Sequence, residues 1–219
     1  LPSGRKKVPD IRESELAIVG LPVYAGRLPN LLLNYLTTWQ SNGAWAVPVV
    51  VYGNRSYGNA LVELYDILRY RGFHPIAAAA FVGQHSFTTR LATGRPDRED
   101  LEKAEQFSAE IVRRILQPGE FTGIKIPGQG APDYGGYYKP KGRDEEVVNF
   151  LKAKPVTTDA CIDCRRCAKV CPMGAIRLDH PSEVSGICIK CNACVKQCPV
   201  HAKQLTDEAY LSHVGFLEN

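Results

Sequence analysis

All eight cysteines of this 219-residue chain lie in one stretch, from Cys161 to Cys198. They form two copies of the spacing C-x2-C-x2-C-x3-C-P, from Cys161 to Pro172 and from Cys188 to Pro199. Three thiolates two residues apart on a tight loop can converge on one metal centre. The fourth cysteine of each copy comes three residues later, and the proline after it fixes the backbone and turns the chain. The pattern therefore predicts two thiolate-ligated metal centres.

This spacing is the one that holds [4Fe–4S] clusters, with the fourth cysteine of each copy binding the other cluster. We predict one cluster on Cys161, Cys164, Cys167 and Cys198, and another on Cys171, Cys188, Cys191 and Cys194. Zinc is an alternative, but zinc sites use C-x2-C pairs and need neither the third cysteine nor the C-x3-C-P ending. A disulfide framework is a second alternative, which suits small secreted chains. Free thiols and oxygen-sensitive clusters predict a reducing, cytoplasmic environment.

The cysteine stretch is an internal repeat, because Cys161–Ala175 recurs as Cys188–Ala202. We expect the isoleucines at 162, 176, 187 and 189 to shield the clusters. Five cations lie between the ligands: Arg165, Arg166, Lys169, Lys190 and Lys196. They could stabilise the reduced, more negative clusters and raise their potential, or they could form a solvated basic rim. We expect His201 and His213 on the surface, since each cluster already has four thiolates.

Before the cysteine repeat, short apolar runs typical of strands alternate with segments whose apolar residues have helical spacing. We predict strands at 16–24, 44–52 and 73–82, helices from about Pro29, from an Asn59 cap to Gly72, and from Asp97 to about Pro118, and a short helix near 144–152. Pro48 is unusual inside a central strand. In the third helix, the inner stripe is expected to be Leu101, Ala104, Ser108, Ile111, Val112 and Ile115. This alternation predicts an α/β fold with a parallel sheet, whose ligands bind beyond the carboxyl ends of the strands. Ordinary turns with exposed tyrosines are the alternative for the loops there.

Four segments resemble the flavodoxin-like half of flavodoxin–ferredoxin fusion proteins of anaerobic bacteria: Gly20–Pro29, Val51–Leu61, Ala78–Ser86 and Gly94–Asp97. With the cysteine repeat, the resemblance implies a flavodoxin-like domain at 1–117, a linker at 118–154 and a bacterial 2[4Fe–4S] ferredoxin domain of α+β fold at 155–219. It places two loops beside the ring of FMN. One consists of Pro22, Val23, Tyr24, Ala25 and Gly26, and the other of Tyr52, Gly53, Asn54, Arg55, Tyr57 and Gly58.

The sequence departs from this family at the phosphate-binding loop. The family begins with a strand and a Ser/Thr/Gly-rich loop that binds the FMN phosphate at a helix N-terminus. Residues Thr88–Gly94 have the nearest composition but follow the last strand. The strands present correspond to the third, fourth and fifth of a 2-1-3-4-5 sheet, which would leave the strand at 16–24 with an unpaired apolar edge. We expect that roughly 40–50 residues, enough for a strand, a helix and a strand, are absent, cut away or numbered elsewhere.

Composition narrows the function classes. The net charge of +4 is mild and shows no basic cluster typical of nucleic-acid binders. No apolar run reaches transmembrane length. The leading hypothesis is low-potential electron transfer with a redox partner protein, through two [4Fe–4S] clusters coupled to FMN. The alternatives are a flavin-dependent reductase that uses the clusters as an electron wire, with His85 as the only histidine near the strand ends, and a non-catalytic subunit whose clusters serve assembly or sensing.

Overall fold

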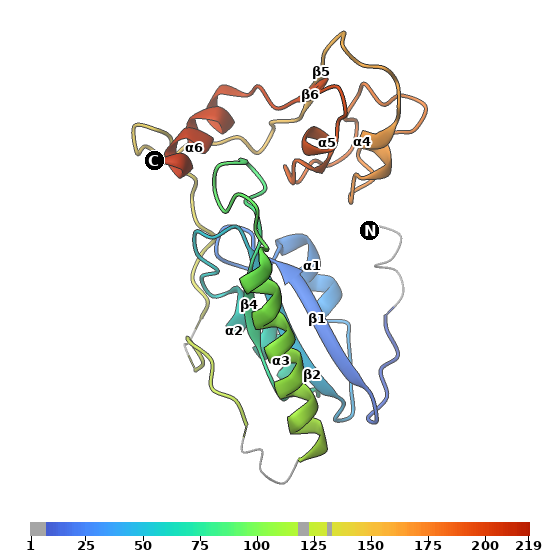
Figure 1. The fold of residues 1–219 in the computed structure, drawn as a ribbon, viewed down its shortest axis with the longest axis vertical. Helices are drawn as coiled ribbons and strands as arrows, with labels where there is room; N and C mark the ends of the chain where they lie inside the picture. Colours follow the sequence, from blue (N-terminus) through green and yellow to red (C-terminus); the bar gives the residue numbers. More distant parts are fainter. Residues whose placement is uncertain (1–7, 118–122, 131–132) are drawn as a thin grey trace. The chain divides into compact units, whose positions relative to one another are not determined.

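The computed structural model describes residues 8–117, 123–130 and 133–219. Residues 1–7 and parts of the predicted linker lie outside the described residues. The elements in chain order are β1 (Leu16–Pro22), α1 (Asn30–Leu36), β2 (Trp45–Tyr52), α2 (Ala60–Tyr70), β3 (His74–Pro75), β4 (Ala79–Val82), α3 (Arg98–Leu116), β5 (Val156–Thr157), α4 (Arg166–Lys169), α5 (Ala193–Lys196), β6 (Lys203–Gln204) and α6 (Glu208–Glu218) (Figure 1). None of these described helices is both long and apolar enough to cross a membrane.

The described chain forms two compact units. The α/β unit comprises residues 8–85 and 91–138, and the cysteine unit comprises residues 86–90 and 139–219. The cysteine unit includes residues 139–154, which the sequence assigns to a linker, and the short segment 86–90, which follows β4 in the chain.

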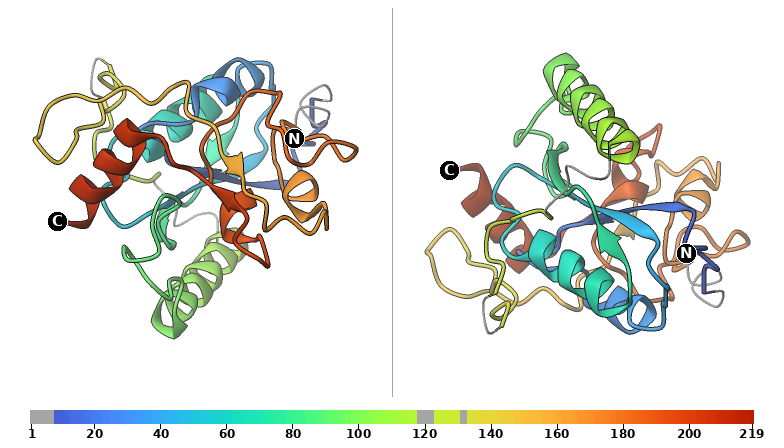
Figure 2. Two further views of the ribbon diagram at one scale, coloured as in Figure 1. Left: turned by 90° about the horizontal axis from the view of Figure 1, so that it is seen from above. Right: turned by 90° about the horizontal axis from the view of Figure 1, so that it is seen from below.

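The sheet of the α/β unit is parallel, as the sequence predicts. β1 pairs with β2 from Leu16 opposite Trp45 to Pro22 opposite Val51, and β2 pairs on its other side with β3 and β4. Helices α1 and α2 cover one face of this sheet and α3 covers the other (Figures 1 and 2). The alternation of strand and helix in the sequence therefore gives a three-layer arrangement.

The third predicted strand is divided into β3 and β4 by one additional residue. Ala46 lies opposite Pro75, whereas Val49 lies opposite Ala79, so the register shifts between them. Pro48 is the physical reason, because proline has no N–H to donate to the neighbouring strand at this point. The carbonyl oxygen of Ile76 instead accepts a hydrogen bond from the Arg114 side chain of α3.

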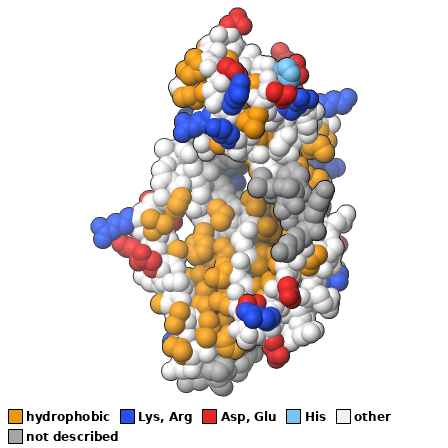
Figure 3. Space-filling model, turned by 90° about the vertical axis from the view of Figure 1, so that its right-hand side faces the viewer, with side chains coloured by type: hydrophobic (Ala, Val, Ile, Leu, Met, Phe, Trp, Pro, Cys, Tyr) orange, Lys and Arg blue, Asp and Glu red, His pale blue; other side chains and the backbone are white. Residues whose placement is uncertain are grey.

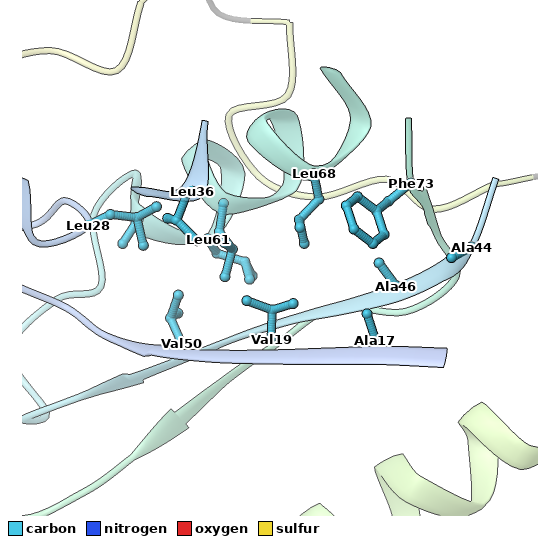
Figure 4. Close-up of a cluster of buried hydrophobic side chains, with 12 residues drawn as sticks. Ala17, Val19, Leu28, Leu36, Ala44, Ala46, Val50, Leu61, Leu68 and Phe73 are labelled. Atoms are coloured by element: carbon cyan, nitrogen blue, oxygen red, sulfur yellow. The ribbon is translucent and has the colours of Figure 1, made fainter. Parts of the chain in front are cut away.

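The main core lies between the sheet and the α1–α2 layer. Side chains of the strands point toward leucines of α1 and α2 and toward Phe73, which follows α2 (Figure 4). The labelled members of this cluster are Ala17, Val19, Leu28, Leu36, Ala44, Ala46, Val50, Leu61, Leu68 and Phe73. Each large apolar side chain buried in this way contributes about 1.5–3 kcal/mol to folding. This core fixes the strand ends and hence the loops that follow them.

Helix α3 begins as predicted, but only part of its predicted inner stripe faces the sheet. Asp97 and Asp100 form a reciprocal capping box at its N-terminus. Ile111 and Ile115 pack with Phe107 against the sheet. Of the predicted stripe, however, Leu101 and Val112 are more than half exposed and Ser108 is exposed as well. The stripe was wrong at these positions because several helix faces carry apolar residues, and the position of the sheet decides which face is buried.

The edge of the sheet at β1 is apolar and open within the described residues. There, β1 pairs only with β2. Hydrophobic side chains gather on this side of the α/β unit (Figure 3), and Ile18 and Val51 are 64% and 44% exposed. The strand at 16–22 therefore has the unpaired edge that the sequence analysis expects of it.

Three local expectations are corrected. Residues 144–152 form no helix, because Lys141 and Val147 pair in a β-bridge around Glu145, whose φ is 64°. The side chain of Asn59 does not cap α2 but donates to the carbonyl oxygen of Tyr134. His213 is buried rather than on the surface, and its Nδ1 lies 2.8 Å from the carbonyl oxygen of Lys141.

Candidate functional site

The two cysteine loops of the cysteine unit have the same backbone conformation. Each position of the first copy recurs 27 residues later, so that Cys161 corresponds to Cys188. Asp163 and Lys190 both have a positive φ, of 52° and 53°, as do Arg165 and Asn192, of 60° and 56°. Left-handed residues at these points curl the backbone tightly. The first three cysteines of each copy are therefore carried around one turn that leads into the short helices α4 and α5.

The fourth cysteine of each copy is also held in the same way. The backbone N–H of Ala175 donates to Sγ of Cys171 at 3.3 Å, and that of Ala202 donates to Sγ of Cys198 at 3.2 Å. Hydrogen bonds to sulfur favour the thiolate over the thiol. The turn after each Cys-Pro pair thus orients the last thiol of the copy.

The cysteine side chains line two separate pockets. The first, which we name the Cys194 pocket, has a volume of about 360 Å³ including the solvent at its mouth. Its cysteines are Cys171, Cys188, Cys191 and Cys194. The second, the Cys167 pocket, measures about 330 Å³ in the same way, and its cysteines are Cys161, Cys164, Cys167 and Cys198. Each pocket thus gathers three thiols from one copy of the motif and the fourth from the other copy.

The donor sets suit iron–sulfur clusters. Four thiols per pocket match the four-cysteine ligation of a [4Fe–4S] cluster. Apolar side chains make up most of the remaining lining of the Cys194 pocket, among them Met173, Ile176, Val184 and Ile189. Ile187 also lines it but is 67% exposed, so it shields the pocket less than expected. Such a lining restricts solvent access, which is one of the ways in which a protein sets the potential of a cluster. Among the described residues, no three His, Cys, Asp or Glu side chains come close enough together to hold a single metal ion.

Burial weakens the acidity of two thiols in the Cys194 pocket. Burial raises the pKa of Cys194 to about 11 and also raises that of Cys191. At Cys198 slight burial raises the pKa, but backbone N–H groups at 200–203 outweigh this effect and lower it. Because metals bind the thiolate, loading the Cys194 pocket must release protons. Burial therefore favours the protonated thiol at Cys191 and Cys194.

An aromatic cluster supports the second cysteine loop. Asn192, directly after Cys191, donates to the hydroxyl of Tyr210 at 2.5 Å and to the carbonyl oxygen of Ser86 at 3.2 Å. Tyr210 lies in α6, and its ring is 5.1 Å from that of Phe87 and 5.6 Å from that of Phe150. Helix α6 and the segment 86–90 therefore hold the loop that carries three of the cysteines lining the Cys194 pocket.

The five predicted cations are mostly on the surface. Arg165, Arg166, Lys169 and Lys196 are exposed, and Lys190 is partly buried. Lys203 was not predicted as a site residue, yet it is only 2% exposed and lines the Cys167 pocket. The repeat could have indicated its burial, because the equivalent residue of the first copy is an isoleucine, Ile176.

In the α/β unit, the two loops expected beside FMN lie against each other. The N–H of Asn59 donates to the carbonyl oxygen of Gly26 at 2.9 Å, and a Cβ on Gly58 would lie only 2.4 Å from that same oxygen. The rings of Tyr52 and Tyr57 are 5.5 Å apart in an edge-to-face arrangement. The structure thus brings the segments 22–26 and 52–58 together at the carboxyl end of the sheet.

A buried ion pair fixes the first of these loops. Glu63 of α2 accepts from Nε of Arg27 at 2.9 Å and from Nη2 at 2.6 Å, and also from the N–H of Leu28. The Arg27 guanidinium lies over the rings of Tyr134 and Tyr137, 5.2 and 5.3 Å from their centroids. No local pattern in the sequence marks this pair, since its members are far apart along the chain.

Comparison with known proteins identifies the cysteine repeat. Residues 160–203 match the family model for a 4Fe-4S dicluster domain. No curated protein and no solved structure matches the chain. The match, together with the eight cysteines in two pockets, shows that the chain combines a parallel sheet flanked by helices with a ferredoxin-like 4Fe-4S dicluster domain.

Proposed function

We propose that this protein transfers electrons at low potential through two [4Fe–4S] clusters, one in the Cys194 pocket and one in the Cys167 pocket. The observation that carries the proposal is that each pocket is lined by four cysteines, three from one copy of the motif and the fourth from the other. The proposed ligands are those eight cysteines. Each cluster, when bound, accepts and releases one electron.

The surroundings of the two pockets support passage of electrons to and from a redox partner protein. Cys161 and Cys164 are exposed, which supports access for a partner at the Cys167 pocket. Cys194 is buried, and the apolar lining restricts water at its pocket. No residue has to donate or accept a proton for electron transfer, so the role of the chain is to bind, orient and shield the clusters.

We propose further that the α/β unit is flavodoxin-like and binds FMN between the loops at 22–26 and 52–58. The support is the resemblance of these segments and their contact at the carboxyl end of a parallel sheet. These loops fit the ring of the flavin better than its phosphate. Helix α1 follows Pro29, which offers no capping side chain, and the Asn59 side chain at the start of α2 is bonded to Tyr134.

A flavin-dependent reductase is the second candidate. Its specific support is His85, whose side chain packs directly on Gly53 of the second loop, where a Cβ would lie 2.5 Å from the imidazole carbon Cδ2. A reductase needs a proton donor beside the flavin, and an imidazole is suited to that role. The electron-transfer proposal needs no such group.

The deciding experiment is the iron, sulfide and flavin content of anaerobically purified protein, followed by reductive titration. We expect about eight irons and two electrons taken up by the clusters of each chain. Bound FMN would add to the electron count and support the fusion proposal. Zinc in place of iron would overturn the electron-transfer proposal, and substrate reduction that depends on His85 would favour the reductase.

A further inference from the structure

Lys203 is a buried cation without a buried anion beside it. It is 2% exposed, and its ammonium donates to the hydroxyl of Thr157 and to the carbonyl oxygen of Ser182, the latter at 3.0 Å. Both partners are uncharged. Within the described residues no carboxylate forms an ion pair with Lys203. Burying an ammonium away from water costs several kcal/mol of free energy unless an anion compensates its charge. A negative charge bound nearby would therefore stabilise Lys203.

The repeat places Lys203 and Ile176 at equivalent positions on the two pockets. Ile176 lines the Cys194 pocket and is 4% exposed, and Lys203 lines the Cys167 pocket. The same point of the pseudo-symmetric fold is therefore a hydrocarbon in one pocket and a positive charge in the other. No charged residue lines the Cys194 pocket among the described residues.

The other cations near the pockets are weaker candidates for this effect. Arg165 and Arg166 line the Cys167 pocket but are exposed, so water and salt screen their charges. Lys190 is partly buried near Cys188, and its ammonium donates to the carbonyl oxygen of Cys188 at 3.3 Å without lining the Cys194 pocket. Burial distinguishes Lys203 from all of these.

We propose that Lys203 is the counter-charge of the cluster in the Cys167 pocket and makes that cluster the first of the two to be reduced. This inference rests on the proposed function. Reduction adds one negative charge to a cluster, and a buried cation stabilises that charge in a medium of low dielectric constant. The electron comes from a low-potential one-electron donor, and the step transfers no proton. Lys203 would act through its charge alone, since it ligates no iron.

The difference in burial acts in the same direction. Cys161 and Cys164 are exposed, whereas Cys194 is buried in an apolar lining. Burial without a compensating charge disfavours the more negative, reduced cluster. Both effects therefore lower the potential of the cluster in the Cys194 pocket relative to its neighbour.

The test is a potentiometric titration with dithionite, followed by electron paramagnetic resonance, on wild type and three variants. We expect two separated reduction steps in wild type. Lys203→Met keeps the apolar stem of the side chain. It should lower the equilibrium constant of the step at higher potential by at least about tenfold, which lowers the potential of that step by about 59 mV for one electron. Lys203→Arg keeps the positive charge and should leave the potential of that step close to the wild-type value. Lys169→Met removes an equal charge from an exposed site and should shift neither step comparably.

A measurement on the wild type alone keeps the inference testable if Lys203→Met fails to retain clusters. In the half-reduced protein, paramagnetic NMR should show the reduced-state shifts on the Cβ protons of Cys161, Cys164, Cys167 and Cys198. Equal distribution over both sets of cysteines, or preference for the Cys194 set, would overturn the role of Lys203. Protein that contains no iron would instead overturn the proposed function.

Discussion

Glu63 offers a sharp test of what holds the first candidate flavin loop in place. Its side chain is 3% exposed and that of Arg27 is 13% exposed, so Glu63→Gln removes the anion from a pair that is almost fully shielded from water. The Glu63 carboxylate also raises the pKa of Arg27. The guanidinium stays charged in the variant because arginine is not deprotonated in proteins, and it loses its only anionic partner among the described residues.

The magnitude follows from that loss. Removing one partner of a buried ion pair costs about 3–5 kcal/mol, because the remaining charge is left uncompensated. The glutamine oxygen can still accept one of the former hydrogen bonds, and the Tyr134 and Tyr137 rings still face the guanidinium. We therefore expect the lower end, about 3 kcal/mol. With a urea m-value of about 2 kcal/mol/M, the unfolding midpoint falls by about 1.5 M.

The assay is urea unfolding of the full chain followed by tryptophan fluorescence. Both tryptophans, Trp39 and Trp45, lie in the α/β unit, so the signal reports on that unit. Glu102→Gln is the matched control. It removes the anion from the Arg98–Glu102 pair, whose side chains are 92% and 52% exposed. Exposed pairs of this kind contribute about 0–1 kcal/mol.

The double variant Arg27→Met/Glu63→Leu separates the pair from the lone charge. Replacing both members of a buried ion pair with apolar residues is often neutral or stabilising. We expect the double variant to be more stable than Glu63→Gln. The reasoning is refuted if Glu63→Gln lowers the midpoint no more than Glu102→Gln does.

Three further outcomes are expected. Cys194→Ser should empty one pocket and lower the iron content from about eight to about four per chain, and unchanged iron would exclude Cys194 as a ligand. Arg95 holds the pKa of Asp100 well below its usual range, so their pair stabilises the fold above the unfolded value of about 3.9 and this contribution is lost as the pH falls through that value toward the folded one. Tryptophan-monitored stability should therefore depend less on pH below about 5 in Asp100→Asn, and equal dependence would contradict this. Gly58 has a φ of 49°, and a Cβ added there would contact the neighbouring loop. Gly94 has a φ of 75°, and a Cβ added there would meet no atom within 4 Å. Alanine at either position incurs about 1–2 kcal/mol of backbone strain, so Gly58→Ala should unfold at lower urea than Gly94→Ala, and equal midpoints would refute the loop contact.

The cysteine motif could be interpreted from the sequence because its information is local. The first three cysteines of each copy, with two residues between neighbours, need only one loop to converge, and the proline after the fourth cysteine turns the chain. The capping box of α3 was predictable for the same reason, since Asp97 and Asp100 are three residues apart. The parallel sheet followed from alternating apolar runs, each of which is a local pattern.

The environment of these elements depends on residues far apart in the chain, and only the tertiary structure decided it. Pro48 suggested a weak strand centre, but the register shift to Ala79 and the replacement donor Arg114 come from elements 30 or more residues away. His213 is polar, yet α6 packs it inside. Lys203 is one of many lysines in the sequence, and its burial at the Cys167 pocket arises where β6 pairs with β5. Burial converts an ordinary surface charge into one that can set a potential, because only the folded chain removes it from water.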